Sequence, residues 1–113
     1  LQPSVINNAI MHLEDMPEMD AILPVCEIFD RYWHQGTPVA HSPKKLEGTQ
    51  FMEPLYKEAG FYIVRTEAFK RELVRVPQKK SFMEVPREDC PDIDQEIDFI
   101  YAEALMQQRL KNT

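Results

Sequence analysis

The feature that most constrains the fold is a short apolar run, Ala21-Ile22-Leu23-Pro24-Val25-Cys26-Glu27-Ile28. The run is too short to form a second long helix after the helical pattern that precedes it, so it predicts a strand buried inside a sheet. Pro24 lies within the run and has no backbone N–H. We therefore expect this strand to lie at a sheet edge or to carry a bulge at Pro24.

Helical spacing of apolar residues precedes the run. The apolar residues at helical intervals are Val5, Ile6, Ala9, Ile10 and Leu13; Pro3 suits a first turn, and the polar residues around Asp15 end the pattern. A helix that passes into a buried strand is the first half of an α/β arrangement.

After the run, strand and helix patterns alternate. Residues 60–65 are rich in β-formers, Thr66 is placed to cap a short helix that reaches Val74, and residues 81–85 form a strand that Pro86 stops. A final helix is expected from Asp94 to about Leu110, with one face made of Ile97, Tyr101, Ala104, Leu105 and Gln108. The whole order predicts the α/β class.

Residues 30–56 are the least regular part of the chain. Prolines and glycines break this stretch into short extended pieces, and Tyr32-Trp33-His34 gives it aromatic surface. Two interpretations stay open for this region: an arm that packs onto a partner subunit, or a simple surface loop.

Composition excludes several classes of protein. The chain has 113 residues, which suits one domain at most, and its net charge of −6 argues against a general nucleic-acid surface. No apolar run has the length of a membrane span. Cys26 reads as a core residue, Cys90 lies in a polar loop, and neither belongs to a disulfide framework, so we expect a cytoplasmic protein.

The chain also lacks a phosphate-binding loop. It has only three glycines, and none of them belongs to a loop that would cradle a nucleotide phosphate. It begins at Leu1 rather than at a methionine. These two observations predict that the chain is a fragment of a longer protein.

An acidic stretch near the C-terminus is the strongest candidate for chemistry. Asp92, Asp94 and Asp98 fall where a loop becomes a helix, with Asp94 expected to cap that helix and Asp98 expected to bond to the loop. Two carboxylates one residue apart can also hold Mg²⁺. Spacing alone leaves both interpretations open, a helix cap with solvated neighbours and a metal site.

Other polar and aromatic residues are less specific. His12, His34 and His41 are scattered without metal-ligand spacing and are interpreted as surface residues. Tyr62 and either Phe82 or Met83 could point into a cleft at the strand ends, or they could fill the core.

Taken in chain order, several short stretches together resemble a known family. They are Leu1-Gln2-Pro3, Tyr32-Trp33, Gln50 to Tyr56, Phe61-Tyr62-Ile63, Phe82 to Pro86, and Asp92-Ile93-Asp94 to Asp98-Phe99. The chain resembles the C-terminal half, or somewhat more, of the cytidylyltransferases that activate nonulosonic acids, which are the CMP-sialic acid synthetases and their relatives. The aspartate motif is the most specific of these pieces.

The resemblance implies a fold and a function. The fold would be part of a Rossmann-like three-layer nucleotidyltransferase domain with an extended dimerisation arm, and the protein would be a homodimer. Asp92 and Asp94 would hold the catalytic Mg²⁺, and Gln50, Tyr62, Phe82 and Met83 would bind the sugar acid. The reaction would transfer CMP from CTP to that acid and release pyrophosphate, but the N-terminal part that binds CTP is absent, so this chain alone is expected to be inactive.

The sequence also departs from the family. Thr49 stands where the family often has Arg, and Glu58-Ala59 stands where it often has Asn-Gly, which is closer to the pseudaminic-acid relatives. Two alternatives remain: a non-catalytic assembly module of the same fold, and a same-fold enzyme that activates another acid, such as Kdo or a phosphonate.

Overall fold

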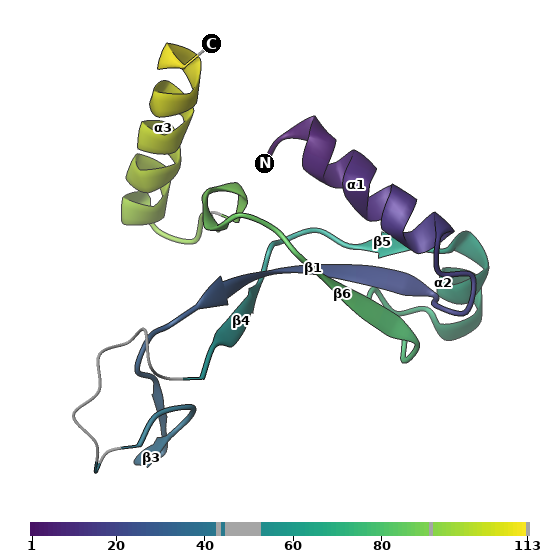
Figure 1. Ribbon diagram of the computed structural model, residues 1–113, viewed down its shortest axis with the longest axis horizontal. Coiled ribbons are helices and arrows are strands. Elements are labelled where there is room, and N and C mark those ends of the chain that lie inside the picture. Colours follow the sequence, from purple (N-terminus) through teal and green to yellow (C-terminus); the bar gives the residue numbers. More distant parts are fainter. Residues whose placement is uncertain (43, 45–52, 91, 113) are drawn as a thin grey trace. The chain divides into compact units, whose positions relative to one another are not determined.

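The computed structural model describes residues 1–42, 44, 53–90 and 92–112 and shows helices combined with β-sheets (Figure 1). The backbone divides into two units, Leu1–Cys26 with Glu58–Thr113, and Glu27–Lys57. The predicted α/β class is confirmed at this level.

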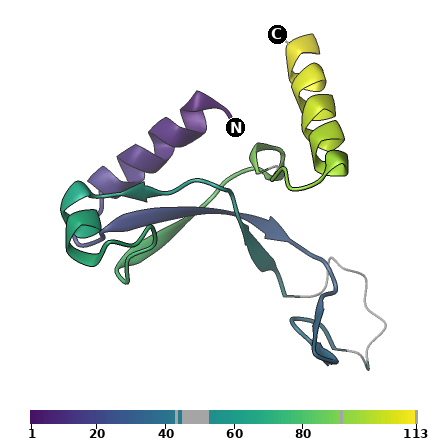
Figure 2. The same ribbon diagram turned by 180° about the vertical axis from the view of Figure 1, so that it is seen from behind.

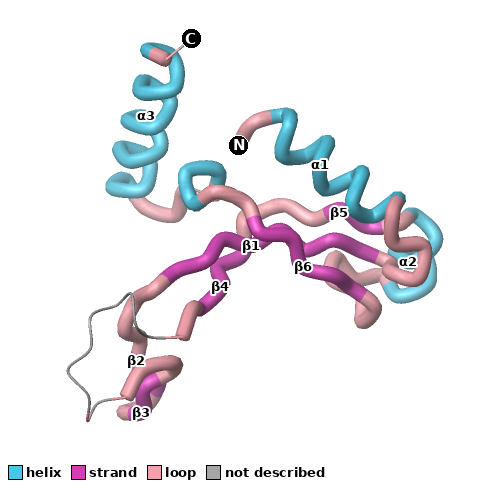
Figure 3. The backbone as a smooth tube through the Cα atoms, in the orientation of Figure 1, coloured by secondary structure: helices cyan, strands magenta, loops and turns pink. Residues whose placement is uncertain are grey.

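Strand β1 (Ala21–Ile28) is the central strand of the larger sheet, and its residues are those of the predicted apolar run. The sheet order is β4-β1-β5, and β6 also pairs with β1. β5 runs antiparallel to β1, whereas β6 runs parallel to it, with Ala21 opposite Lys80 and Val25 opposite Glu84. Figure 3 colours these strands magenta. The prediction of a buried strand is confirmed, because all but one of the residues of β1 are buried.

The expectation that Pro24 marks an edge strand is wrong. Pro24 is fully buried within the central strand and lies opposite Met83 of β6. The Val25 carbonyl accepts a hydrogen bond from Val85 on the β6 side, while the Pro24 carbonyl accepts one from Ala59 on the other side. The nitrogen of Pro24 therefore faces the side where β4 has ended and β5 has not begun, so its missing N–H removes no ladder bond there.

Helix α1 (Pro3–Glu14) has the predicted extent and buries Val5, Ala9 and Leu13. Its C-terminal end is held by the Arg65 side chain. The guanidinium donates to the carbonyl oxygens of Leu13 at 2.7 Å, Met16 at 3.2 Å and Met19 at 2.8 Å. Carbonyls at a helix end lack intrahelical partners, so this arginine caps α1 from a distant part of the chain.

The segment after the second unit differs from the prediction. Strand β4 (Leu55–Glu58) was not expected, and β5 (Ile63–Val64) is shorter than the strand predicted over residues 60–65. Gly60 has a φ of 89°, which turns the chain between the two strands. Helix α2 (Thr66–Glu72) has Arg65 rather than Thr66 as its N-cap, and its C-cap is Leu73, whose φ of 55° is left-handed.

The C-terminal part contains β6 (Lys80–Glu84), the 3-10 turn η2 (Arg87–Asp89) and helix α3 (Glu96–Lys111). The ion pair between Arg109 and Asp89 joins α3 to η2 at 3.4 Å. Of the face predicted for this helix, only Leu105 is partly covered, and its other members are exposed. The remaining partly covered residues of α3 are Asp98, Ala102 and Arg109.

The second unit contains a small hairpin of β2 (Trp33–His34) and β3 (Thr37–Pro38). Gln35 and Gly36 both have positive φ, 50° and 79°, as a two-residue hairpin turn with the right twist requires. The short extended pieces predicted for this region are thus confirmed where the structure describes it. Gln50 lies outside the described residues.

The core comes mainly from α1 and β1 (Figure 2 gives the reverse view of these elements). Ile22, Pro24, Cys26 and Pro77 are its largest fully buried side chains. Cys26 is therefore a core residue, as predicted. Cys90 is buried as well, and its thiol donates to the Pro86 carbonyl at 3.5 Å.

Candidate functional site

The acidic loop before α3 is fixed by Asp98. One oxygen of its carboxylate accepts hydrogen bonds from the backbone N–H of Asp94 at 3.1 Å and of Gln95 at 3.0 Å. The prediction that Asp98 bonds to the loop is confirmed. The prediction that Asp94 caps the helix is wrong, because Gln95 is the N-cap and Asp98, three residues later, reaches back to it as in a capping box.

The other two aspartates of the loop, Asp92 and Asp94, do not take part in these hydrogen bonds through their side chains. Asp92 and Asp94 are both exposed, and within the described part of the chain no hydrogen bond or ion pair engages either carboxylate. Capping therefore does not account for Asp94. The sequence left a helix cap and a metal site as two interpretations of the acidic loop. In the structure, the capping role belongs to Asp98.

Asp92 and Asp94 have carboxylate oxygens that could bind a metal ion. Among the residues that the structure describes, no group of three or more His, Cys, Asp and Glu side chains is placed to hold one. Mg²⁺ does not need such a cage, because it usually takes one or two carboxylates and completes its shell with water and substrate phosphates. Two exposed carboxylates with open lone pairs, Asp92 and Asp94, fit that mode of binding.

Tyr62 lies in a small polar cluster of its own. Its hydroxyl donates to the Glu58 carboxylate at 2.5 Å, and the Arg75 guanidinium carbon lies 5.9 Å from the centroid of the Tyr62 ring. The hydrogen bond to Glu58, helped by partial burial and the negative charge of Glu58, raises the pKa of Tyr62 above 10.0, although the positive charge of Arg75 opposes the shift. The phenol is thus held in its neutral form with its proton directed at Glu58.

Phe82 and Met83 point to opposite faces of β6, as neighbours on a strand must. The Phe82 side chain is 59 % exposed, whereas Met83 is only 7 % exposed. Met83 lines a cavity of about 290 Å³ between α1 and the end of β6, together with Asn8, His12, Asp15 and Glu84. Of the two, Phe82 is open to solvent, and Met83 belongs to the lining of a half-open cavity whose acidic side chains are Asp15 and Glu84.

In the described part of the chain, the cavity that Met83 lines does not contain the other predicted site residues. The lining of the Met83 cavity includes none of Tyr62, Phe82, Asp92 and Asp94. Tyr62 and the aspartates come from different elements, before β5 and before α3 respectively. Gln50 falls among the residues that are not described, so its position relative to the others is not assigned.

A second cavity, of about 680 Å³, lies between the start of α1 and the end of α3. Its wall is rich in amides and includes the ion pair of Asp89 and Arg109. Asp89 is buried, so this pair is the best-shielded charge contact in the described part of the chain. The pair holds α3 in place and needs no ligand to explain it.

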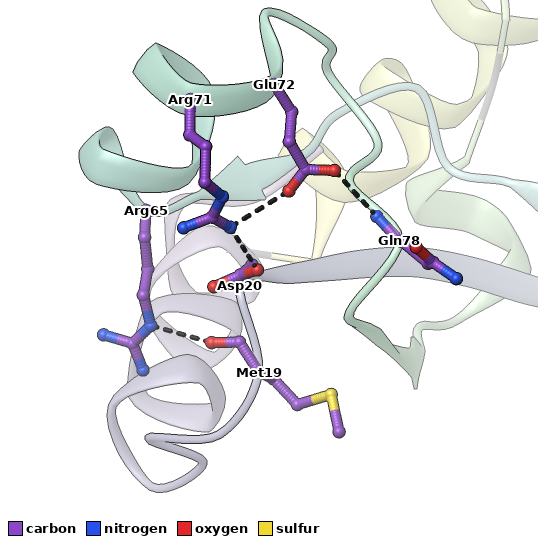
Figure 4. Close-up of polar contacts among 6 residues, drawn as sticks. All are labelled: Met19, Asp20, Arg65, Arg71, Glu72 and Gln78. Carbon is purple, nitrogen blue, oxygen red and sulfur yellow. Dashed lines mark hydrogen bonds and ion pairs between the residues drawn. The ribbon is translucent and has the colours of Figure 1, made fainter.

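Sequence reasoning missed a charged cluster at the other end of the sheet. Arg71 bridges Asp20 at 2.8 Å and Glu72 at 3.0 Å, and the Glu72 carboxylate accepts from the Gln78 N–H at 3.5 Å (Figure 4). Glu72 and Asp20 keep the pKa of Arg71 above its ordinary value. Asp20 precedes β1, which is the amino end of the strand, whereas ligands of α/β sheets bind at the carboxyl ends. We interpret the cluster as structural.

The three histidines do not form a site. His12 and His34 are exposed, as expected of surface residues. His41 is only partly exposed, and its ring lies edge-on to Trp33 with centroids 5.0 Å apart.

No protein-family model matches the chain, and no curated protein matches it either. Within the described residues, none of the helices combines the length and the apolar character that crossing a membrane requires.

Proposed function

We propose that this chain is the C-terminal portion of a cytidylyltransferase that activates a nonulosonic, sialic-type sugar acid. The observation that carries the proposal is the state of the acidic loop. Asp98 alone fixes the loop to the helix, and Asp92 and Asp94 keep both carboxylates exposed and unpaired in the described part of the chain. Carboxylates left exposed in this way are available to a cation such as Mg²⁺, which takes only one or two protein carboxylates.

The proposed roles follow from the chemistry of each side chain. Asp92 and Asp94 hold Mg²⁺, which, when bound, neutralises charge on the phosphates of CTP. Asp98 keeps the backbone of Asp94 and Gln95 in place and so orients the metal-binding carboxylates. Gln50, Tyr62, Phe82 and Met83 bind the sugar acid in this proposal. Phe82 has the exposure that a contact with substrate needs, and Met83 contributes from the cavity wall.

The finer architecture belongs to the same proposal. We assign the unit with β1, β5 and β6 to part of a Rossmann-like three-layer domain, for which the parallel pairing of β1 with β6 is the supporting feature. We assign residues 30–56 to a dimerisation arm. The support for the arm is its exposed aromatic surface, since Tyr32, Trp33 and Tyr56 are each about half exposed.

A second candidate function rests on helix α3. Large apolar side chains of this helix are exposed, among them Ile97, Phe99, Ile100, Tyr101, Met106 and Leu110. Such a surface is typical of a contact with another protein part. It favours the alternative of a non-catalytic assembly module, and it is also compatible with an enzyme whose remaining part covers α3. The other alternative, a same-fold enzyme that activates another acid such as Kdo or a phosphonate, differs from the proposed enzyme only in its substrate.

The test is release of pyrophosphate by the protein in which this chain occurs. We expect release only when CTP, Mg²⁺ and a nonulosonic acid are all present. Asp94→Asn and Asp92→Asn should each lower the rate at least tenfold and weaken Mn²⁺ binding measured by electron paramagnetic resonance. Glu103→Gln is the matched control, because it removes an exposed carboxylate from α3 away from the loop.

Each outcome decides between the candidates. Turnover with Kdo or a phosphonate instead of a nonulosonic acid selects the same-fold alternative. A protein that neither releases pyrophosphate with any of these acids nor binds Mn²⁺ through Asp92 and Asp94 is not the proposed enzyme, and the assembly module then replaces it.

A further inference from the structure

A small surface cluster brings together a carboxylate, a phenol and a guanidinium. Glu58 ends β4, Tyr62 precedes β5, and Arg75 follows α2. The turn at Gly60, with its positive φ of 89°, lets Tyr62 reach back to Glu58 across a gap of four residues. A Cβ on Gly60 would meet no atom within 4 Å, so the turn is open to solvent on that side.

The proton of the Tyr62 hydroxyl has a fixed direction. It is donated to the Glu58 carboxylate, and a phenol has only one proton to give. Toward any other molecule the Tyr62 oxygen can therefore only accept a hydrogen bond. It suits a hydroxyl or amide N–H of a ligand, and it does not suit a carboxylate.

A sugar acid also needs a positive charge. The residues assigned to its binding, Gln50, Tyr62, Phe82 and Met83, carry none. The cavity beside Met83 is lined by Asp15 and Glu84 against the single imidazole of His12, so its charge repels an acid. A guanidinium recognises a carboxylate through two parallel hydrogen bonds, which makes an available arginine near Tyr62 the natural partner.

The guanidinium of Arg75 is available to bind a ligand, whereas those of Arg65 and Arg71 are engaged within the protein. The Arg65 guanidinium is used by the carbonyls at the end of α1, and Arg71 is used by Asp20 and Glu72. Arg75 is exposed, and in the described part of the chain its one recorded contact is the face of the Tyr62 ring. A cation–π contact keeps the guanidinium over the ring and leaves its N–H groups free to bind.

We propose that Arg75 binds the carboxylate of the sugar acid while the Tyr62 oxygen accepts a hydrogen bond from a hydroxyl of the same molecule. The inference rests on the proposed function and identifies its acid-recognising residue. Glu58 is a positioning residue, because it fixes the proton of Tyr62, and its negative charge directs the substrate carboxylate away from itself and toward Arg75.

The experiment compares an acid with its neutral ester. Binding of N-acetylneuraminic acid and of pseudaminic acid, each beside its methyl ester, is measured by calorimetry on the protein in which this chain occurs. We expect the wild type to prefer the acid. Arg75→Ala should weaken acid binding about 10- to 100-fold, the range for a hydrogen bond to a charged group, and leave ester binding unchanged.

Two further variants and one control sharpen the result. Arg75→Gln keeps most of the volume and should behave as Arg75→Ala, whereas Arg75→Lys should restore part of the preference for the acid. Arg87→Ala removes an exposed arginine of η2 and should change nothing. A preference for the acid that survives in both Arg75→Ala and Arg75→Gln would overturn the inference.

Failure of this inference can be separated from failure of the proposed function. If the wild type forms a CMP-sugar and the Arg75 variants keep their acid preference, only the role of Arg75 is lost. If the wild type binds neither acid and forms no CMP-sugar, the proposed function fails and the role of Arg75 fails with it.

Discussion

Replacing Arg65 with alanine should destabilise the whole larger unit, because one side chain ties three carbonyl groups. The bonds to Leu13 and Met19, at 2.7 and 2.8 Å, have the length of charge-assisted hydrogen bonds, whereas the bond to Met16 at 3.2 Å is weaker. A hydrogen bond from a charged donor contributes about 1.5–3 kcal/mol. The bonds are not additive, since two share one nitrogen and the freed carbonyls regain water, so we expect a loss of about 2–4 kcal/mol.

The measurement is equilibrium unfolding in urea followed by circular dichroism. Arg65→Ala should lower the free energy of unfolding with little change in the denaturant slope. Arg65→Lys keeps the charge but cannot form the fork, so its loss should lie between zero and that of alanine. Arg87→Ala is the exposed control and should stay within about 0.5 kcal/mol of wild type. If Arg65→Ala costs no more than Arg87→Ala, the capping role assigned to Arg65 is refuted.

Two further predictions concern the acidic loop and Tyr62. Asp98→Ala should destabilise by about 1 kcal/mol and increase amide exchange in the first turn of α3, while the exposed control Glu103→Ala should leave that turn intact, and equal exchange in both would contradict the capping assignment. Titration of phenolate absorbance should place the pKa of Tyr62 above 10.0, and Glu58→Gln should lower it. Because the folded-state pKa is the raised one, the contribution of this phenol to stability is complete below pH 10 and is lost as pH rises through the folded value. A pKa of Tyr62 that does not respond to Glu58→Gln would show that the hydrogen bond is not its cause.

Local patterns predicted the elements that bury an apolar face. The spacing of Val5, Ala9 and Leu13 specified α1, and the run from Ala21 to Ile28 specified β1, because both signals come from burial itself. The strands that pair with β1 were harder to predict. Leu55–Glu58 is mostly exposed, so β4 has no apolar pattern to mark it.

Pro24 shows why tertiary context overrides a local rule. Proline is excluded from a central strand only where its N–H would have a partner, and the gap between β4 and β5 removes that partner. Residues Leu55 to Val64 carry no sign of this gap except Gly60.

Only part of the candidate site could be predicted, because local sequence does not show tertiary contacts. The motif from Asp92 to Phe99 identified the loop, and the role of Asp98 followed from its place one turn into the helix. The identity of the cap did not follow, because Asp94 and Gln95 are adjacent and either can occupy that position. Glu58 and Arg75 were missed because their association with Tyr62 depends on the turn at Gly60 and on where α2 ends.

The parallel pairing of β1 with β6 also has a consequence for folding kinetics. Ala21 pairs with Lys80, which lies far from it in the sequence. The pairing therefore has a high contact order, and we expect it to form late in folding. Until then the most apolar segment of the chain is exposed, with the composition that favours pairing between identical copies. Pro24 interrupts that segment in its middle, and a strand without a donor there is a poor template for a second copy. We therefore expect Pro24, which removes no hydrogen bond from the folded sheet, to reduce aggregation of the chain before the sheet is complete.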